Sequence, residues 1–386
     1  MMLTLWKNCE VYAPRHLGRR DILIEGGKIA AVEGSLSRWL TAPEIDVRDM
    51  EGAVVCPGLV DIHVHVTGGG GEQGPASRTP ELQLTDFTLN GVTSVVGLLG
   101  TDGVSRGLEN LLLKVRALEE EGISTWALTG NYRFPTKTLF GDVEKDIALI
   151  DKFIGVKTAL ADHRGSSVTG QELARLGSEA RIGGMISGKP GYVTIHMGGH
   201  EHRMDELFWA LEHSEVPAKT FLPTHCCRTP ELIAHAVRLN NLGAYIDFTA
   251  ELPDNEAGTA AALASALRQG AAPERVTMSS DAGGSQPSFN EAGECVGLTY
   301  TTSVTLLQEL RRMIFREGLS LETALRFFTE NPARLIGQSG KKGTVAPGAD
   351  ADLLVLDEGY AVRHVMAKGK VAVWEASALM KGKFEK

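Results

Sequence analysis

Short apolar runs alternate with longer segments of helical periodicity over most of the chain. The short runs are rich in β-branched residues, as buried strands are. In the longer segments apolar residues recur three and four positions apart, and glycine often follows as a helix stop, for example in LENLLLKVRALEEEG and PELIAHAVRLNNLG. The apolar runs that we predict as strands are residues 59–66, 93–99, 124–129, 153–158, 192–197, 219–224, 244–249 and 276–280.

Eight strands that alternate with helices predict a parallel sheet. A helix between two strands returns the chain to the same edge, so consecutive strands pair in parallel. Eight is also the number of strands that closes such a sheet on itself. We therefore expect the α/β class and a (β/α)8 TIM barrel over residues 57–338. Barrels of this kind carry their chemistry at the C-terminal ends of the strands.

The two ends of the chain have a different pattern. The N-terminal end contains strand-like runs separated by glycine turns, in LTLWKNCEVY, RRDILIEGGKIAAVEG and AVVCP. The C-terminal end repeats this pattern in GTVAPGADADLLVLD and HVMAKGKVAVWE. We predict one small β-sandwich-like domain that is built from residues 1–56 and 339–386.

Composition and charge exclude several classes of partner. The 386 residues carry a net charge of -9 and no basic stripe, which argues against nucleic acid and against an anionic membrane surface. No run reaches the roughly 18 to 20 apolar residues of a membrane span, and the first residues lack a secretory signal pattern. We expect a cytoplasmic protein that acts on small molecules. The cysteines are odd in number and scattered, unlike a disulfide framework: Cys9, Cys56, Cys226, Cys227 and Cys295.

Histidines stand at the ends of several predicted strands. His63 and His65, in VDIHVHVTGGGGEQGP, are two positions apart on a strand and therefore share a face. By itself this pair fits two hydrogen-bonded core histidines as well as two metal ligands. The fifth, sixth and eighth strands, however, end in His196, His225 and Asp281. Polar groups at the ends of separate strands face one cavity, and imidazole and carboxylate groups suit zinc, so we predict a metal site.

Lys157 lies inside the apolar run FIGVKTAL. A lysine is rarely buried without a partner, so this side chain could extend outward or pair with a carboxylate. Alternatively, burial lowers the pKa of a lysine, and the neutral amine can add carbon dioxide. The resulting carbamate has two oxygens, which could bridge two metal ions.

These positions, with the tail motifs NPARLIG and KKGTVAPGADADLLVLD, resemble the amidohydrolase superfamily and, within it, the isoaspartyl (β-aspartyl) dipeptidases. The resemblance covers the whole chain and implies two zinc ions in each subunit. One ion is held by His63, His65 and Asp281, and the other by the histidines of the fifth and sixth strands. Lys157, modified to N6-carboxylysine, bridges the two ions together with a hydroxide. The resemblance also implies that Asp281 transfers a proton to the leaving amine and that Tyr132 faces the developing oxyanion.

The resemblance further implies how the isoaspartyl residue is held. Glu72 binds its α-amino group, while the backbone of Gly70 and the hydroxyls of Thr101 and Ser285 bind its α-carboxylate. An isoaspartyl bond leaves both groups free, whereas an ordinary peptide bond has used the carboxylate, so this set would select the β-linked isomer. Without the resemblance, Glu72 reads equally as a solvated loop residue and the neighbouring glycines as a flexible loop.

Two arginines complete the substrate site that the resemblance implies. Arg164 and Arg228 follow the fourth and sixth strands and match the groups that hold the C-terminal carboxylate, which a guanidinium fits in a bidentate manner. Arginines at such places are otherwise surface or helix-start residues. The implied substrates are small dipeptides, and the implied assembly is a homo-oligomer, possibly an octamer.

Two other functions compete with this interpretation. One is a cyclic-amide hydrolase of the dihydroorotase or hydantoinase kind, which would use the same metals. The other is a non-catalytic scaffold on the same fold, although all six expected ligands are present here. Some nearby polar residues receive no role: His200 and His202 are expected in a loop without metal, Cys226 is expected to be structural, and Lys341 and Lys342 are expected to be solvated.

Overall fold

The eight predicted parallel strands all form in the computed structural model, which describes residues 3–42, 44–250, 258–289 and 295–386. Short 3-10 turns, Ala218–Thr220 and Pro273–Arg275, precede two of them, so that the sixth strand begins later than predicted. The strands are β6 (Leu59–Val64), β7 (Val92–Gly97), β8 (Ser124–Gly130), β9 (Phe153–Leu160), β10 (Tyr192–Met197), β11 (Phe221–Thr224), β12 (Ile246–Thr249) and β13 (Val276–Ser279).

These strands form a curled parallel arrangement. Strands β6 to β11 make one six-stranded sheet in sequence order, and β12 pairs with β13. Asp247 on β12 connects the six-stranded sheet to the β12–β13 pair. Its carboxylate accepts hydrogen bonds from Thr224 Oγ1 on β11 (2.7 Å) and from Ser279 Oγ on β13 (2.6 Å). At the other edge a parallel bridge joins Val64 to Ala282, just after β13. The expected α/β class and its parallel strand pairing are confirmed.

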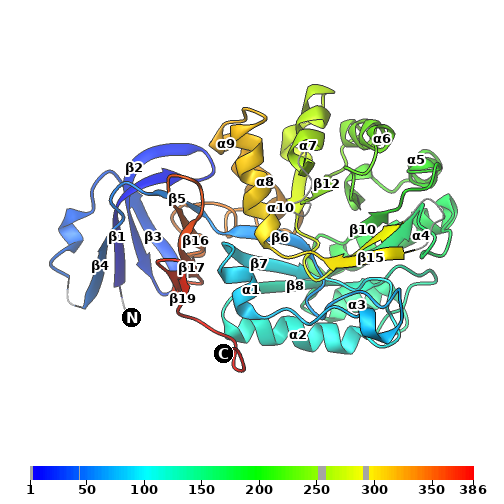
Figure 1. The fold of residues 1–386 in the computed structure, drawn as a ribbon, viewed down its shortest axis with the longest axis horizontal. Helices are drawn as coiled ribbons and strands as arrows, with labels where there is room; N and C mark the ends of the chain where they lie inside the picture. The colour runs from blue at the N-terminus through cyan, green and yellow to red at the C-terminus, as the bar shows by residue number, and fades with distance from the viewer. Residues whose placement is uncertain (1–2, 43, 251–257, 290–294) are drawn as a thin grey trace.

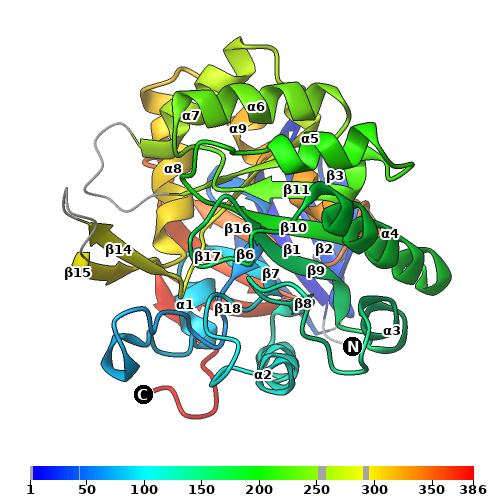
Figure 2. The same cartoon turned by 90° about the vertical axis from the view of Figure 1, so that its right-hand side faces the viewer.

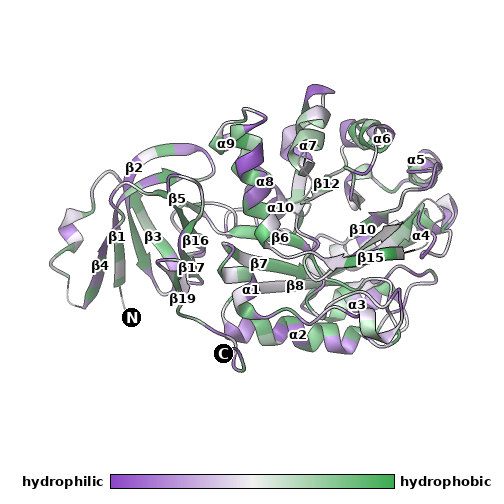
Figure 3. Cartoon of the chain, viewed as in Figure 1, coloured by the Kyte–Doolittle hydropathy of each residue, from purple (hydrophilic) through white to green (hydrophobic). Residues whose placement is uncertain are grey.

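Amphipathic helices cover the outside of the strands (Figure 2). Helix α2 buries Leu108, Leu111, Val115 and Leu118, spaced three to four residues apart, while its other face is polar (Figure 3). No helix of the described ranges is long and apolar enough to cross a membrane. The helices are α1 (Leu84–Thr88), α2 (Leu108–Glu121), α3 (Val143–Leu149), α4 (Gly170–Ser187), α5 (Asp205–Glu212), α6 (Pro230–Asn241), α7 (Gly258–Arg268), α8 (Val304–Phe315), α9 (Leu321–Arg326) and α10 (Glu330–Leu335).

Strands from both ends of the chain pair in one nine-stranded sheet. Their order is β19-β18-β17-β16-β5-β1-β2-β3, with β4 also paired to β1. The blue N-terminal and red C-terminal strands therefore lie together in Figure 1. The strands are β1 (Leu3–Tyr12), β2 (His16–Glu25), β3 (Lys28–Glu33), β4 (Ile45–Asp49), β5 (Val54–Pro57), β16 (Leu353–Leu356), β17 (Val362–Ala367), β18 (Lys370–Trp374) and β19 (Ser377–Ala378).

An antiparallel hairpin, β14 (Ser285–Phe289) and β15 (Cys295–Tyr300), was not predicted. It follows β13 directly and so begins at the C-terminal end of the parallel strands. Its sequence, SQPSF with a proline inside the strand, lacks the alternation from which the other strands could be recognised. The side chain of Cys295 lies outside the described residues, whereas the other four cysteines are free thiols.

The expectation that Lys342 is solvated was wrong. Its side chain is buried, and Nζ donates hydrogen bonds to Asp352 Oδ2 (2.5 Å) and to Ser124 Oγ on β8 (2.6 Å). Asp350 Oδ2 lies 2.8 Å from the same nitrogen. The adjacent Lys341 is exposed, as expected. Two carboxylates compensate the buried charge, and this pairing joins the C-terminal part of the chain to the parallel sheet.

Replacing Lys342 should destabilise the fold strongly. In Lys342→Ala the buried Asp352 loses its cation, whereas Asp350 keeps an ion pair with Lys28. An uncompensated buried carboxylate costs about 3–5 kcal/mol. Lys341→Ala, at the exposed neighbour, should change stability by less than about 0.5 kcal/mol. Denaturant unfolding of both variants against the wild type measures the difference. Equal transition midpoints for the two variants would show that the buried cluster does not contribute.

Candidate active site

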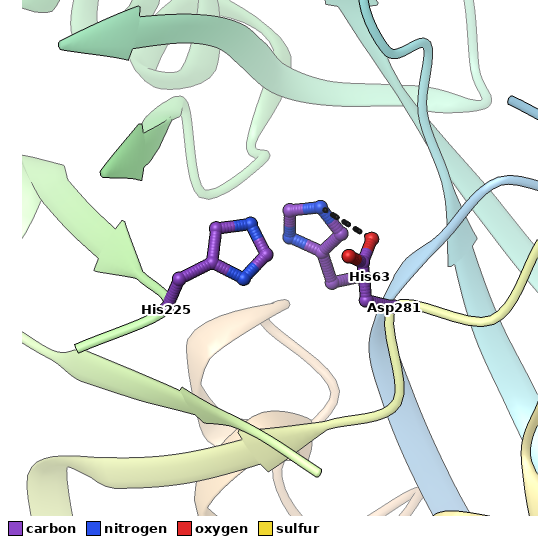
Figure 4. A group of neighbouring side chains, drawn as sticks. All are labelled: His63, His225 and Asp281. Atoms are coloured by element: carbon purple, nitrogen blue, oxygen red, sulfur yellow. Dashed lines mark ion pairs between the residues drawn. The ribbon is translucent and has the colours of Figure 1, made fainter. Parts of the chain in front are cut away.

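The histidines and the aspartate predicted as ligands meet at one end of the parallel strands. His63 is at the end of β6, and His225 and Asp281 follow β11 and β13. Nitrogen and carboxylate atoms of these three residues all lie within 4.8 Å of one another (Figure 4). His65 joins them through Nε2, 3.1 Å from Asp281 Oδ1, and the ring of His196 lies 4.5 Å from that of His225. The structure thus brings all five predicted side chains together.

Unusual backbone conformations aim two of these side chains. His225 and Asp281 have φ angles of 63° and 54°, in the left-handed region that residues other than glycine rarely adopt. Such conformations cost free energy and cluster at functional sites, where the surrounding structure holds them in place. In both cases the chain turns immediately after a parallel strand, which directs the side chain inward over the strand ends.

Lys157 lies beneath this cluster, fully buried in β9. Its Nζ is 2.7 Å from His63 Nε2. Burial lowers the pKa of Lys157 to about 7, which favours the neutral amine. The alternative that the side chain extends outward to solvent is therefore wrong.

The chemistry of the cluster fits a metal ion. Within the described residues, four of its buried atoms have no hydrogen-bond partner: His63 Nδ1, His65 Nδ1, His225 Nε2 and Asp281 Oδ1. Burial lowers the pKa of His63, His196 and His225 well below its usual value, so these rings are neutral. Neutral imidazoles and a carboxylate are the ligands that zinc takes. Unpaired buried polar atoms are costly, and a bound cation would remove that cost.

Two residues that were not predicted form hydrogen bonds with the predicted ligands or with their neighbours in the chain. Thr249, at the end of β12, forms a 2.6 Å hydrogen bond with His225 Nδ1. Asp61, two positions before His63, accepts hydrogen bonds from the backbone and side chain of Ser280, next to Asp281. Burial raises the pKa of Asp61 to about 7. The sequence signal for Asp61 was its position in the run DIHVH, where an acidic residue interrupts an otherwise apolar strand.

A cavity of about 710 Å³ opens over the cluster, in the size range of small-molecule sites. The predicted ligands His65, His196, His225 and Asp281 line this cavity, whereas Lys157 and His63 are not among its lining residues. All of the predicted substrate-contacting residues line it: Gly70, Glu72, Thr101, Tyr132, Arg164, Arg228 and Ser285.

Glu72 is the centre of a polar network on one wall of the cavity. Ser285 Oγ lies 2.9 Å and 3.0 Å from its two carboxylate oxygens. Thr101 Oγ1 and Arg164 NH1 are each 3.4 Å from Glu72 Oε1. Three residues, from the loops after β7 and β9 and from the start of β14, therefore converge on one carboxylate, which argues against a merely solvated Glu72.

The backbone of Gly70 is held close to the segment that precedes α1. Gly70 has a φ of 78°, and a Cβ at this position would lie 2.3 Å from Ser77 O, so only glycine fits. Gly70 forms an antiparallel bridge with Arg78. The donors of its two hydrogen bonds are the N–H groups of the residues that follow them, Gly71 and Thr79. The N–H group of Gly70 itself is not used in this bridge.

Tyr132 and the two arginines surround His196. The Tyr132 hydroxyl is 2.6 Å from His196 Nδ1, and burial raises the pKa of Tyr132 so that it keeps its proton. Arg164 NH2 and Arg228 NH1 lie 3.3 Å and 3.5 Å from His196 Nε2. Arg228 also donates a 2.6 Å hydrogen bond to Met197 O. Both arginines are thus inward-facing, unlike typical surface residues.

The residues without an expected role lie away from the cluster. His200 and His202 stack on each other, 4.8 Å between centroids, on the exposed turn before α5. Cys226 points into the apolar core and is fully buried.

Residues 54–372 match the amidohydrolase family, and the chain belongs to this family. Among solved structures, the chain is similar to the β-aspartyl dipeptidase of Fervidobacterium islandicum AW-1 in complex with a β-Asp-Leu dipeptide. The TM-score is 0.93 at 38% sequence identity, over 98% of this chain and 97% of that chain.

More distant relatives share less. A D-hydantoinase superposes with a TM-score of 0.68 at 17% identity, over 100% of this chain and 98% of that chain, a likeness of fold alone. Adenine deaminase 2 of Agrobacterium fabrum is 26% identical over 93% of this chain. The chain spans only 54% of that protein's length.

Zinc should stabilise the metal-free protein. Adding zinc after removal of metal with a chelator should raise Tm, because a ligand that binds only the folded state at 100 times its Kd adds about 2.7 kcal/mol. His63→Ala should lower the bound zinc per chain. The control His200→Ala, at an exposed histidine outside the cluster, should bind zinc like the wild type. Metal analysis and thermal unfolding measure both effects, and an unchanged Tm on adding zinc would contradict a metal site.

Proposed function

We propose that the protein hydrolyses the β-aspartyl (isoaspartyl) peptide bond of dipeptides. The observation that carries this proposal is the wall formed by Glu72, Thr101, Ser285 and Arg164 beside the histidine–aspartate cluster. This wall combines one carboxylate with several donors, as a substrate with an ammonium and carboxylate groups requires. The similarity to a structure solved with β-Asp-Leu supports the same substrate class.

The proposed metal centre holds two zinc ions. His63, His65 and Asp281 would hold one ion and His196 and His225 the other, within a closed eight-stranded barrel. The bridge between Val64 and Ala282 supports closure of this barrel. Two zinc ions supply an activated water at neutral pH and polarise the scissile carbonyl.

Three groups of the chain prepare this centre and complete the chemistry. Carbon dioxide would add to the neutral amine of Lys157 with release of a proton to water, and the resulting carbamate would offer two oxygens to the zinc ions. The low pKa of Lys157 and its contact with His63 support this role. The Tyr132 hydroxyl, held as a donor beside His196, is available to the developing oxyanion. The Asp281 carboxylate would accept the proton of the attacking water and deliver it to the leaving amine, which departs poorly unless protonated.

Recognition of the β-linked isomer follows from the same wall. The Glu72 carboxylate pairs with the free α-ammonium of the aspartyl residue, while Ser285, Thr101 and the N–H of Gly70 donate to its α-carboxylate. Arg164 and Arg228 bind the C-terminal carboxylate in the proposed pose. An α-linked dipeptide lacks the free α-carboxylate and would leave buried donors unpaired.

A dipeptide panel on zinc-analysed protein tests this function. We expect hydrolysis of β-Asp-Leu, with kcat/KM for α-Asp-Leu lower by roughly 10⁴-fold, because a site built for hydrogen bonds rejects a substrate that cannot make them. Hydrolysis of dihydroorotate or hydantoin without turnover of β-Asp-Leu would instead indicate a cyclic-amide hydrolase. No turnover of any substrate with zinc and bicarbonate supplied would indicate a non-catalytic scaffold.

Glu72→Gln should damage recognition of the free amine. Losing a charged hydrogen bond of about 1.5–3 kcal/mol lowers kcat/KM for β-Asp-Leu by roughly 10- to 100-fold. With an N-acetylated β-Asp-Leu, which has no ammonium group, Glu72→Gln and the wild type should perform alike. Glu201→Gln, at an exposed glutamate after β10, is the matched control and should behave as the wild type. An unchanged kcat/KM for the free dipeptide in Glu72→Gln would remove Glu72 from the site.

A further inference from the structure

Asp162, which lines the cavity just after β9, has no role in the chemistry described above. Its side chain is nearly buried, with 4% of its area exposed. Its carboxylate accepts four hydrogen bonds from neighbouring residues. Three come from Arg164, through the backbone N–H (2.8 Å), Nε (2.9 Å) and NH2 (2.8 Å). The fourth joins Oδ2 to His196 Nε2 at 2.8 Å.

The contact with His196 decides which ring nitrogen can bind a ligand. The shortest contact of Nε2 is the one to the Asp162 carboxylate, 2.8 Å against 3.3 Å and 3.5 Å for the two arginines. A carboxylate only accepts hydrogen bonds, so Nε2 of the neutral ring carries the proton and Nδ1 keeps its lone pair. The Tyr132 hydroxyl approaches this Nδ1 at 2.6 Å as a donor. Because the Nε2 side is occupied by Asp162, Nδ1 is the nitrogen of His196 that is left to hold a metal ion.

The contact with Arg164 decides where the guanidinium points. Asp162 occupies Nε and NH2 of the fork, which leaves NH1 facing the Glu72 side of the cavity, 3.4 Å from Glu72 Oε1. An arginine side chain has many rotamers in solution, and ordering it costs free energy. A buried bidentate partner removes much of that freedom before a substrate arrives.

The backbone around Asp162 is also fixed. Ala161 has a φ of 53°, and its carbonyl accepts a hydrogen bond from His200 N–H at 3.0 Å. Gly198 passes so close that a Cβ on it would lie 2.0 Å from Ala161 O. The loops after β9 and β10 are therefore packed backbone to backbone, and Asp162 sits where the first loop meets His196.

We propose that Asp162 is a positioning residue that orients a metal-binding histidine and a substrate-binding arginine at the same time. Through His196 it presents Nδ1 to the metal, and through Arg164 it presents NH1 to the substrate. The substrate half of this inference rests on the proposed function, whereas the histidine half does not. One carboxylate thus couples the metal centre to the pocket that selects the substrate.

Zinc affinity and kinetics of two variants test the coupling. In Asp162→Asn the amide can donate to His196 Nε2 and shift the ring proton to Nδ1. Chelator competition should then show one zinc ion bound about 10- to 100-fold more weakly, the range found when such partners are lost, and KM for β-Asp-Leu should rise. Arg164→Ala should raise KM but leave zinc affinity within about twofold of the wild type. Asp205→Asn, at an exposed aspartate, is the control and should change neither quantity.

A spectroscopic test needs no Asp162 variant and so does not depend on its folding. In metal-free protein labelled with ¹⁵N-histidine, the His196 signals, assigned by their absence in His196→Gln, should report a proton on Nε2 and a bare Nδ1. The opposite tautomer, or equal zinc affinity in Asp162→Asn and the wild type, would overturn the proposal. Absence of β-Asp-Leu hydrolysis by the wild type would contradict only the proposed function, since the zinc and tautomer measurements would still decide the role of Asp162.

Discussion

Burial of ionisable side chains at one end of the parallel strands is the constraint on which the site depends. A lysine, four histidines and several carboxylates lie within a few side chains of one another and largely out of water. Such groups are tolerated only when they are neutral, paired or bound to a ligand. Burial lowers the pKa values of Lys157, His63, His196 and His225 and raises those of Asp61 and Asp247. Within the described residues, four buried atoms of the cluster still have no hydrogen-bond partner: His63 Nδ1, His65 Nδ1, His225 Nε2 and Asp281 Oδ1.

Three features of the fold hold these buried side chains in place. Asp247 joins β11, β12 and β13 through hydroxyl hydrogen bonds, and Asp61 ties β6 to the residues around Asp281. Residues with left-handed backbone angles then turn the chain inward after β9, β11 and β13. On the far side, the buried Lys342 cluster attaches the C-terminal segment to β8. Side chains held in this way can keep ligand geometry without help from solvent.

Substrate choice depends on the loops more than on the strands. A D-hydantoinase shares the fold at 17% identity, so the arrangement of the strands alone does not select a substrate. The loop after β6 is the clearest example, because it follows directly on His63 and His65 and carries both Gly70 and Glu72. Its glycines permit the close backbone approach to Ser77, and that approach brings Glu72 to Ser285 at the start of β14.

The sequence alone was enough to locate the eight parallel strands and the strand-like runs at both ends of the chain, because burial of one face or of a whole strand leaves a local pattern. The histidines and the aspartate could be recognised as candidate site residues, because the predicted strands end at them. Only the tertiary structure decided that Lys342 rather than Lys341 is buried and where the β14–β15 hairpin lies. It also decided that Asp162 joins His196 to Arg164. These features depend on contacts between residues distant in the chain and on backbone angles such as those of His225 and Asp281, and neither leaves a periodic signal in the sequence.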